Sequence, residues 1–132
     1  MAFAKDKRKQ IHAKYSGHCA YCGDIIELKA MQIDHIIPQR NFTQVIRNKA
    51  KVPLFLKHLT ENDVNHDDNL NPACRICNKR KDAFDLEFFR SELSEQVNRL
   101  NKYSSAYRLA KKFGQIKETK QPIVFYFERN LY

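Results

Sequence analysis

Hydrophobic positions along this chain follow a helical period first and an extended one soon afterwards. Residues 4–15 predict a helix with basic side chains on its exposed surface. Gly17 ends that helix, because glycine accepts the left-handed conformation beyond a helix end. Residues 25–28 and 30–37 are apolar or alternating enough for two short strands. Pro38 closes the second strand, since proline has no N–H to continue a ladder.

The middle of the chain has a less regular pattern. Apolar positions within residues 42–60 suggest a helix, but Pro53 would interrupt it. Residues 61–71 are polar and acidic, which indicates a loop. A further helix is predicted to begin between residues 72 and 74 and to continue towards Lys81.

The last third of the chain predicts helices followed by a strand. Asp85 is a good N-cap, and apolar residues follow it at three- and four-residue intervals up to residue 100. Ser104 or Ser105 would cap another helix that stops at Gly114. Residues 123–127 are continuously apolar and predict a terminal strand. The chain is therefore expected to belong to the α+β class.

The charge of the chain favours a polyanionic partner. Its 132 residues contain 24 Lys and Arg against 15 Asp and Glu, a net charge of +9. Cationic side chains displace the counterions condensed on nucleic acid, although charge alone separates nucleic acid from membrane only weakly. The first residues contain no apolar run that could act as a secretion signal, and no stretch approaches the length of a membrane span. We therefore expect a cytoplasmic protein with no membrane partner.

Four cysteines occur as two Cys-x-x-Cys knuckles, Cys19/Cys22 and Cys74/Cys77. Each knuckle places two sulfur atoms on one turn, and two knuckles complete a closed tetrahedron suited to structural Zn²⁺. Two disulfides are one alternative, but a reducing cytosol favours metal binding. A rubredoxin-type iron centre is another, and it would colour the protein.

Asp34 and His35 end an apolar segment and together offer a hard metal ligand beside a general base. Phosphodiester hydrolysis needs both, because a cation neutralises charge on the phosphate while a base activates water. Neighbours on a regular strand point to opposite faces, so the strand must bend for both to reach one substrate. Taken alone, such a pair is more often an ordinary strand end than a catalytic site.

The motifs and their order resemble the HNH endonuclease family, in the form with a four-cysteine zinc framework. The matching segments are Cys19-x-x-Cys22-Gly23, Ile33-Asp34-His35-Ile36-Ile37-Pro38, Asp68-Asn69-Leu70 and Pro72-Ala73-Cys74-x-x-Cys77-Asn78-x-x-Lys81. This match covers residues 17–82, and the region after residue 82 is more loosely similar to small phage and prophage HNH proteins. The resemblance implies a ββα-metal (His-Me finger) core, in which two strands and a helix surround one divalent ion.

Residue roles follow from the resemblance, position by position. His35 corresponds to the general base and Asp34 to a metal ligand. Asn69 corresponds to the middle asparagine of the family, which holds the histidine-bearing loop in place. Asn65 is a rival for that position, but Asn69 directly before Leu70 fits better.

Asn78 stands where the last histidine of the family would be, so the chain resembles an H-N-N variant. An amide oxygen binds softer transition ions less well than imidazole, which favours Mg²⁺ or Mn²⁺ as the catalytic ion. His66 could supply an imidazole instead, although a solvated loop histidine is the simpler interpretation. Lys79, Arg80 and Lys81 follow on the same helix and are expected to contact DNA phosphates, with a solvated basic face as the alternative.

We therefore expect one HNH nuclease domain over residues 1–132, with a core at 17–82, an N-terminal basic helix at 4–15 and a C-terminal helical extension at 85–132 that ends in a strand. The expected activity is metal-dependent hydrolysis of DNA phosphodiester bonds. The alternatives are a non-catalytic, zinc-stapled nucleic-acid-binding module and a protein that binds an acidic partner through its 86–113 helices. Phage or mobile-element proteins are candidate partners, and the oligomeric state is not predicted.

Overall fold

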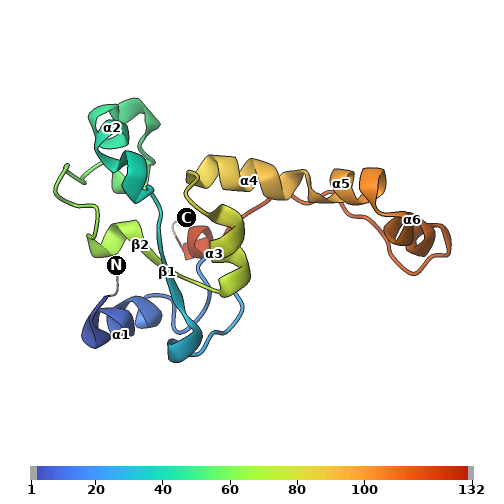
Figure 1. Ribbon diagram of the computed structural model, residues 1–132, viewed down its shortest axis with the longest axis horizontal. Helices are drawn as coiled ribbons and strands as arrows, with labels where there is room; N and C mark the ends of the chain where they lie inside the picture. Colours follow the sequence, from blue (N-terminus) through green and yellow to red (C-terminus); the bar gives the residue numbers. More distant parts are fainter. Residues whose placement is uncertain (1–2, 131–132) are drawn as a thin grey trace. The chain divides into compact units, whose positions relative to one another are not determined.

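The computed structural model describes residues 3–130 of the chain. These residues form six α-helices and one two-stranded antiparallel sheet, which confirms the α+β class (Figure 1). They divide into two compact units, residues 3–86 with 125–130 and residues 87–124. The helices are α1 (Lys5–Ala13), α2 (Phe42–Arg47), α3 (Arg75–Lys81), α4 (Leu86–Ser94), α5 (Gln96–Tyr103) and α6 (Ser105–Lys112).

The sheet pairs β1 (Gln32–His35) with β2 (Leu70–Ala73), with Asp34 opposite Asn71. The strand predicted at 25–28 is wrong, since that segment makes only an isolated bridge between His18 and Ile25 and is followed by a 3-10 turn. The true partner of β1 lies at the end of the predicted acidic loop. A Pro72-containing strand is tolerated because both strands of a two-stranded sheet are edges.

The first unit packs its helices around this sheet. Helix α1 lies next to β2, and its Ile11 joins Met31 and Leu70 in one buried cluster. Helix α3 lies next to β1 (Figure 1). Gly17 has φ of +83°, as expected of a residue that ends a helix. The ambiguous segment 42–60 contains only the short helix α2 and 3-10 turns on either side of Pro53.

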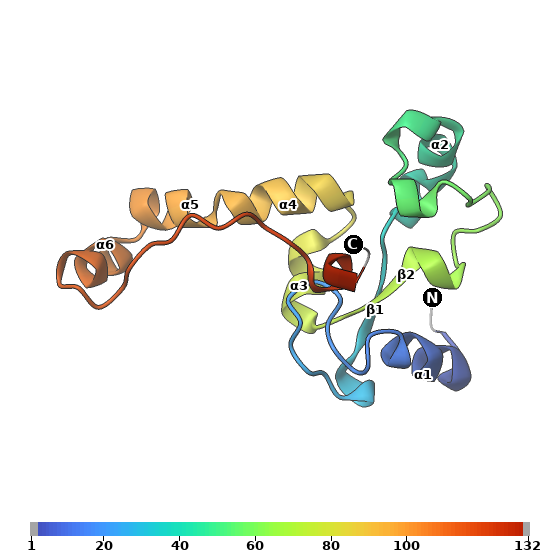
Figure 2. The ribbon, with the colours of Figure 1, turned by 180° about the vertical axis from the view of Figure 1, so that it is seen from behind.

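The C-terminal strand predicted at 123–127 is also wrong. Phe125 and Phe127 are buried, but the backbone N–H groups of Tyr126 and Phe127 donate to the carbonyls of Tyr21 and Ala20, at 3.0 and 2.8 Å. Residues 126–130 then form a 3-10 helix, η6 (Tyr126–Asn130), beside the loop that carries the first knuckle (Figure 2). The apolar run therefore packs onto a turn rather than onto the edge of a sheet.

The second unit contains most of α4 together with α5 and α6. The predicted single helix up to residue 100 is interrupted near Glu95, where α5 begins. The Oγ atom of Ser104 accepts from the N–H of Tyr107 at 3.1 Å and so caps α6, and Gly114 follows that helix with φ of +73°. Among residues 3–130, no helix combines the length and the apolar character needed to cross a membrane.

Candidate metal centre and active site

The four cysteines converge in the first unit although they come from two distant turns. One sulfur atom from each of Cys19, Cys22, Cys74 and Cys77 lies within 4.8 Å of the others. The Sγ atoms of Cys22 and Cys74 are 3.9 Å apart, well beyond the length of a disulfide bond. All four cysteines are free thiols. This arrangement is compatible with a structural Zn²⁺ ion, and the four cysteines form no disulfide.

The four thiols cannot all ionise at this spacing without a cation. The pKa of Cys19 is lowered to about 4, chiefly because the Cys77 thiol donates to its sulfur, with help from backbone N–H groups. Burial raises the pKa of Cys22 to about 12, and the hydrogen bond to Cys19 raises the pKa of Cys77. One thiolate is therefore stabilised by protons on its neighbours, which is the role that a bound metal ion would take over.

The backbone of the first knuckle is held tightly in place. Gly23 has φ of +83°, and a Cβ atom there would lie 2.9 Å from Cδ2 of Tyr126. The N–H of Ala20 donates to the carbonyl of Pro72 at 2.8 Å, which ties the knuckle to β2. Glycine is thus required both for the turn and for the close approach of the C-terminal segment.

Asp34 and His35 occupy the end of β1, and the chain bends at residues 36 and 37. Both residues line one cleft of about 540 Å³, to which Asn78 of α3 also contributes. The bend follows both residues, and Asp34 and His35 themselves lie in regular strand. The remaining residues of the cleft are Ile33, Pro38, Gln39, Arg40, Asp82 and Ala83.

Asp34 is 4% exposed and its carboxylate is already held by two partners. The Tyr21 hydroxyl donates to Oδ2, and the Lys81 amine lies 3.1 Å from the same oxygen. Burial raises the pKa of the Asp34 carboxyl above its ordinary value, while the positive charge of Lys81 and the Tyr21 hydroxyl oppose that shift. Asp34 is thus fixed in position by an ion pair that is itself buried.

Lys81 does not fit its predicted role as a phosphate contact. Its side chain is 0% exposed, and its amine donates to the backbone carbonyl of His35 at 2.9 Å as well as to Asp34. Lys79 and Arg80 are exposed on the same helix. Consecutive helical residues point in different directions, so one member of the basic run must face the core. That member is Lys81, one turn beyond Asn78.

Replacing Lys81 with methionine is expected to destabilise the protein by about 3–5 kcal/mol at pH 7, because the change leaves the Asp34 charge buried without its cation. Methionine keeps the aliphatic length, so little of the loss comes from packing. Chemical denaturation of the metal-loaded protein, followed by circular dichroism, measures the effect.

The matched control for this change is Lys79→Met, which alters an exposed lysine two residues away and should change stability little. Adding Asp34→Asn to Lys81→Met should recover part of the loss, since a neutral amide needs no counter-charge. An Lys81→Met protein as stable as the Lys79→Met protein contradicts the ion pair.

His35 makes one side-chain hydrogen bond that the sequence did not assign. Its Nε2 atom lies 2.8 Å from Oδ1 of Asn65. An amide oxygen only accepts, so Nε2 carries a proton, and in the neutral ring the lone pair is then on Nδ1. Asn65, the rival candidate in the sequence, is therefore the asparagine that orients the histidine.

Asn69 acts on the backbone after His35 instead of on the ring. Its Oδ1 accepts from the N–H of Ile37 at 2.8 Å, and its Nδ2 donates to the carbonyls of Ile37 and Val64 at 3.2 and 2.9 Å. The side chain is fully buried. This amide pairs with Ile37 as a neighbouring strand would, and so it holds the bend in place.

The two charged residues of the cleft that the sequence did not single out are Arg40 and Asp82. Arg40 is exposed, donates to the carbonyl of Ala83 at 2.9 Å and lies over the ring of Phe84. Asp82 ends α3 with φ of +51°, a conformation that costs a non-glycine residue energy. No sequence motif includes either residue. Both line the cleft because the end of α3 packs beside the segment that follows β1.

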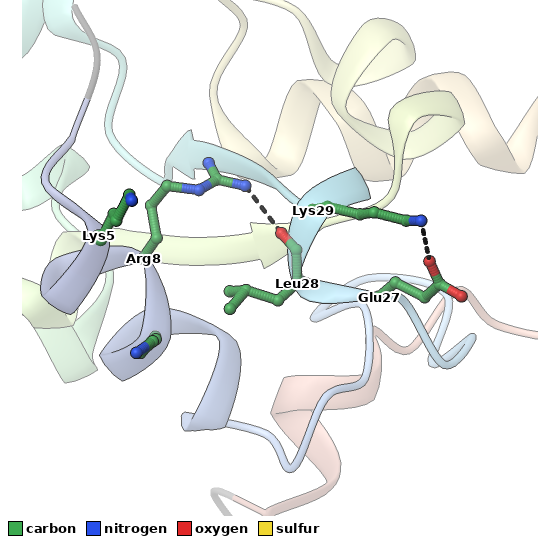
Figure 3. Close-up of a pocket in the computed structure, with 6 residues that line it drawn as sticks. Lys5, Arg8, Glu27, Leu28 and Lys29 are labelled. Atoms are coloured by element: carbon green, nitrogen blue, oxygen red, sulfur yellow. Dashed lines mark hydrogen bonds and ion pairs between the residues drawn. The ribbon is translucent and has the colours of Figure 1, made fainter.

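A second cavity, of about 490 Å³, lies between α1 and the turn at Leu28–Ala30. Figure 3 shows its basic lining, with Arg8 donating to the Leu28 carbonyl and Lys29 beside Glu27. Lys5 and Lys9 complete the cationic side chains of the lining. None of the residues predicted for catalysis or metal binding lines this cavity.

Comparison of the chain with protein-family models, with curated proteins and with solved structures found no match.

Proposed function

We propose that this protein is a metal-dependent DNA endonuclease with an HNH-type ββα-metal core built from β1, β2 and α3. The observation that carries the proposal is the single cleft lined by His35, Asp34 and Asn78. These three residues come from the end of β1 and from α3, and they supply a base, a carboxylate and an amide. Such a set suits phosphodiester hydrolysis, in which an ion neutralises charge on the phosphate and a base activates water.

His35 acts as the general base in this proposal. Its Nδ1 atom keeps a lone pair because Nε2 donates to Asn65, so the ring can take a proton from a water molecule through Nδ1. Asn65 orients the ring, and Asn69 fixes the backbone on which the ring is mounted. The activated water then attacks phosphorus, and the expected products carry 5′-phosphate and 3′-hydroxyl ends.

Asp34 and Asn78 would hold the catalytic divalent ion, since a carboxylate and an amide oxygen suit Mg²⁺ or Mn²⁺. When bound, such an ion stabilises charge on the phosphate and on the departing oxygen. Tyr21 and Lys81 hold the Asp34 carboxylate in a fixed position. Asp82 adds a second carboxylate to the same cleft.

The four-cysteine cluster would bind Zn²⁺ in a structural role, since four thiolates leave no coordination position open for a substrate. The ion would join the first knuckle to the start of α3, and Asn78 directly follows Cys77 on that helix. DNA is the proposed substrate because the net charge is +9 and because Lys79 and Arg80 are exposed beside the cleft residue Asn78.

Incubation of the zinc-loaded protein with supercoiled plasmid tests this function. Nicking is expected with Mg²⁺ or Mn²⁺ and not with an excess of EDTA over a short incubation. An Asp34→Asn variant should lose at least about 100-fold in rate at fixed Mg²⁺, because it weakens the proposed ion site. Plasmid that stays supercoiled in every divalent ion contradicts the proposal.

One observation favours the non-catalytic, nucleic-acid-binding alternative. The Lys81 amine already neutralises the Asp34 carboxylate, so an ion would have to compete with it. This alternative predicts DNA binding that weakens steeply with salt and no cleavage. A gel-shift titration beside the nicking assay distinguishes the two functions.

A further inference from the structure

A second group of metal-binding side chains lies outside the cleft and the cysteine cluster. It consists of His58, His66 and Asp68, which we call the His-His-Asp cluster. One ligand atom from each lies within 4.8 Å of the others, and all three side chains are exposed. The Nε2 atom of His58 is 2.7 Å from Oδ2 of Asp68, and Nδ1 of His66 is 3.8 Å from the same oxygen.

These distances are close to what a transition-metal ion requires. Ligand atoms about 2.0–2.1 Å from a tetrahedral ion lie about 3.3–3.4 Å apart. The two observed separations bracket that value, and exposed side chains can adjust at little cost. The Nδ1 atom of His66 accepts from the N–H of Asp68 at 3.0 Å, so it is unprotonated, as a metal ligand must be. The ion would replace that hydrogen bond.

The loop that carries His66 and Asp68 is acidic, and two of its four carboxylates already have cationic partners. The loop at 61–68 contains Glu61, Asp63, Asp67 and Asp68. Glu61 pairs with Arg47 and Asp67 with Lys7. Asp63 accepts hydrogen bonds from Thr60 through its carboxylate, at 2.7 and 2.9 Å, and its backbone carbonyl accepts from the N–H of His66 at 3.0 Å, so a further carboxylate belongs to the same loop.

We infer that His58, His66 and Asp68 bind a second ion of the zinc type, with water completing its coordination. Two imidazoles and one carboxylate with an open position match the ligand sets of such ions better than those of Mg²⁺. The ion would tie residue 58 to residues 66–68.

The segment that the ion would close contains Asn65, whose side chain accepts from His35. It also contains Val64, whose carbonyl accepts from Asn69. On the proposed function, the second ion would therefore help to position the general base from outside the cleft. The metal site itself does not depend on that function.

Titration of the full-length, zinc-loaded protein with ZnCl₂ in a calorimeter tests the site. Excess Mg²⁺ in the buffer occupies oxygen-rich sites but competes poorly for imidazole. The wild type should bind one equivalent beyond the cysteine cluster, with a dissociation constant of about 1–10 μM. His58→Ala and His66→Ala should each weaken this binding at least about tenfold. Asp67→Asn is the matched control, since it changes a neighbouring carboxylate outside the cluster and should leave the affinity unchanged.

Cobalt(II) substitution gives an independent spectroscopic readout. The added equivalent should show weak visible bands without the intense sulfur-to-cobalt charge transfer of a cysteine site, and His58→Ala should remove those bands. Absence of a second equivalent up to about 100 μM free Zn²⁺, far above the expected constant, would overturn the inference. Equal affinity in His58→Ala and Asp67→Asn would also overturn it.

The plasmid assay separates this inference from the proposed function. A second equivalent with no nicking by the wild type would leave the metal site standing and remove the nuclease. Nicking by a wild type that binds no second equivalent of zinc would support the nuclease and remove the His-His-Asp metal site. If both stand, His58→Ala should lower the nicking rate without changing its dependence on Mg²⁺.

Discussion

Replacing His35 with alanine is expected to lower the rate of plasmid nicking by about 10²–10⁴-fold, the usual contribution of a general base. The reason is local, because His35 lines the cleft and Nε2 of its ring is held by Asn65. Conversion of supercoiled to nicked plasmid under single-turnover conditions, with protein in excess, measures the chemical step.

Two further variants show whether the loss in His35→Ala comes from the base. Asn65→Ala should reduce the rate less, since the ring keeps its basic nitrogen and loses only the contact that orients it. His12→Ala removes a histidine of α1 that contacts the carbonyl of Ile26 and lies outside the cleft, so its rate should match the wild type. If His35→Ala nicks as fast as His12→Ala, His35 is not the base.

Replacing Cys74 with serine is expected to release zinc and to unfold most of the first unit. Structural zinc sites supply about 10–16 kcal/mol of apparent binding energy. The whole stability of a domain is about 5–15 kcal/mol. Cys74 also begins α3, where its sulfur accepts from the N–H of Cys77 at 3.4 Å. The loss should therefore affect β2, α3 and the first knuckle together.

Thermal unfolding followed by circular dichroism, together with zinc released to a colorimetric chelator, measures this effect. Wild-type protein stripped of metal should show the same loss of structure, and metal analysis of the purified protein separates zinc from iron. A Cys74→Ser protein that is free of zinc but melts at the wild-type temperature would show that the cluster is not structural.

Much of the fold was predictable where a local signal agreed with the final packing. The helix predicted at 4–15 forms at 5–13, and the glycine after it adopts the conformation that ends helices. Ser104 caps α6 as predicted. The spacing of the four cysteines also predicted one cluster. Each knuckle is a local turn, so the tertiary structure had only to bring the two turns together.

The predictions that failed depended on contacts between distant segments. β2 reads Leu-Asn-Pro-Ala, a poor strand by composition, and it forms because it pairs in register with β1. The apolar run at 123–127 looked like a strand, but its N–H groups donate to the turn of the first knuckle. Strand propensity measures how well a segment packs against the neighbouring strand. The sequence alone does not show which segment that neighbour is, so these two segments could not be predicted correctly.

The sequence by itself determined the identity and order of the chemical groups: four thiols in two knuckles, an acid followed by a histidine, and amides at 65, 69 and 78. Only the tertiary structure decided what each group contacts. It buried Lys81 in an ion pair with Asp34 and placed Asn65 in a hydrogen bond with the ring of His35. It also placed Asn69 in hydrogen bonds with the backbone of Ile37, and His58 in contact with Asp68. Such pairings depend on which face of a strand or helix turns inward, and that choice is made by packing between segments far apart in the chain.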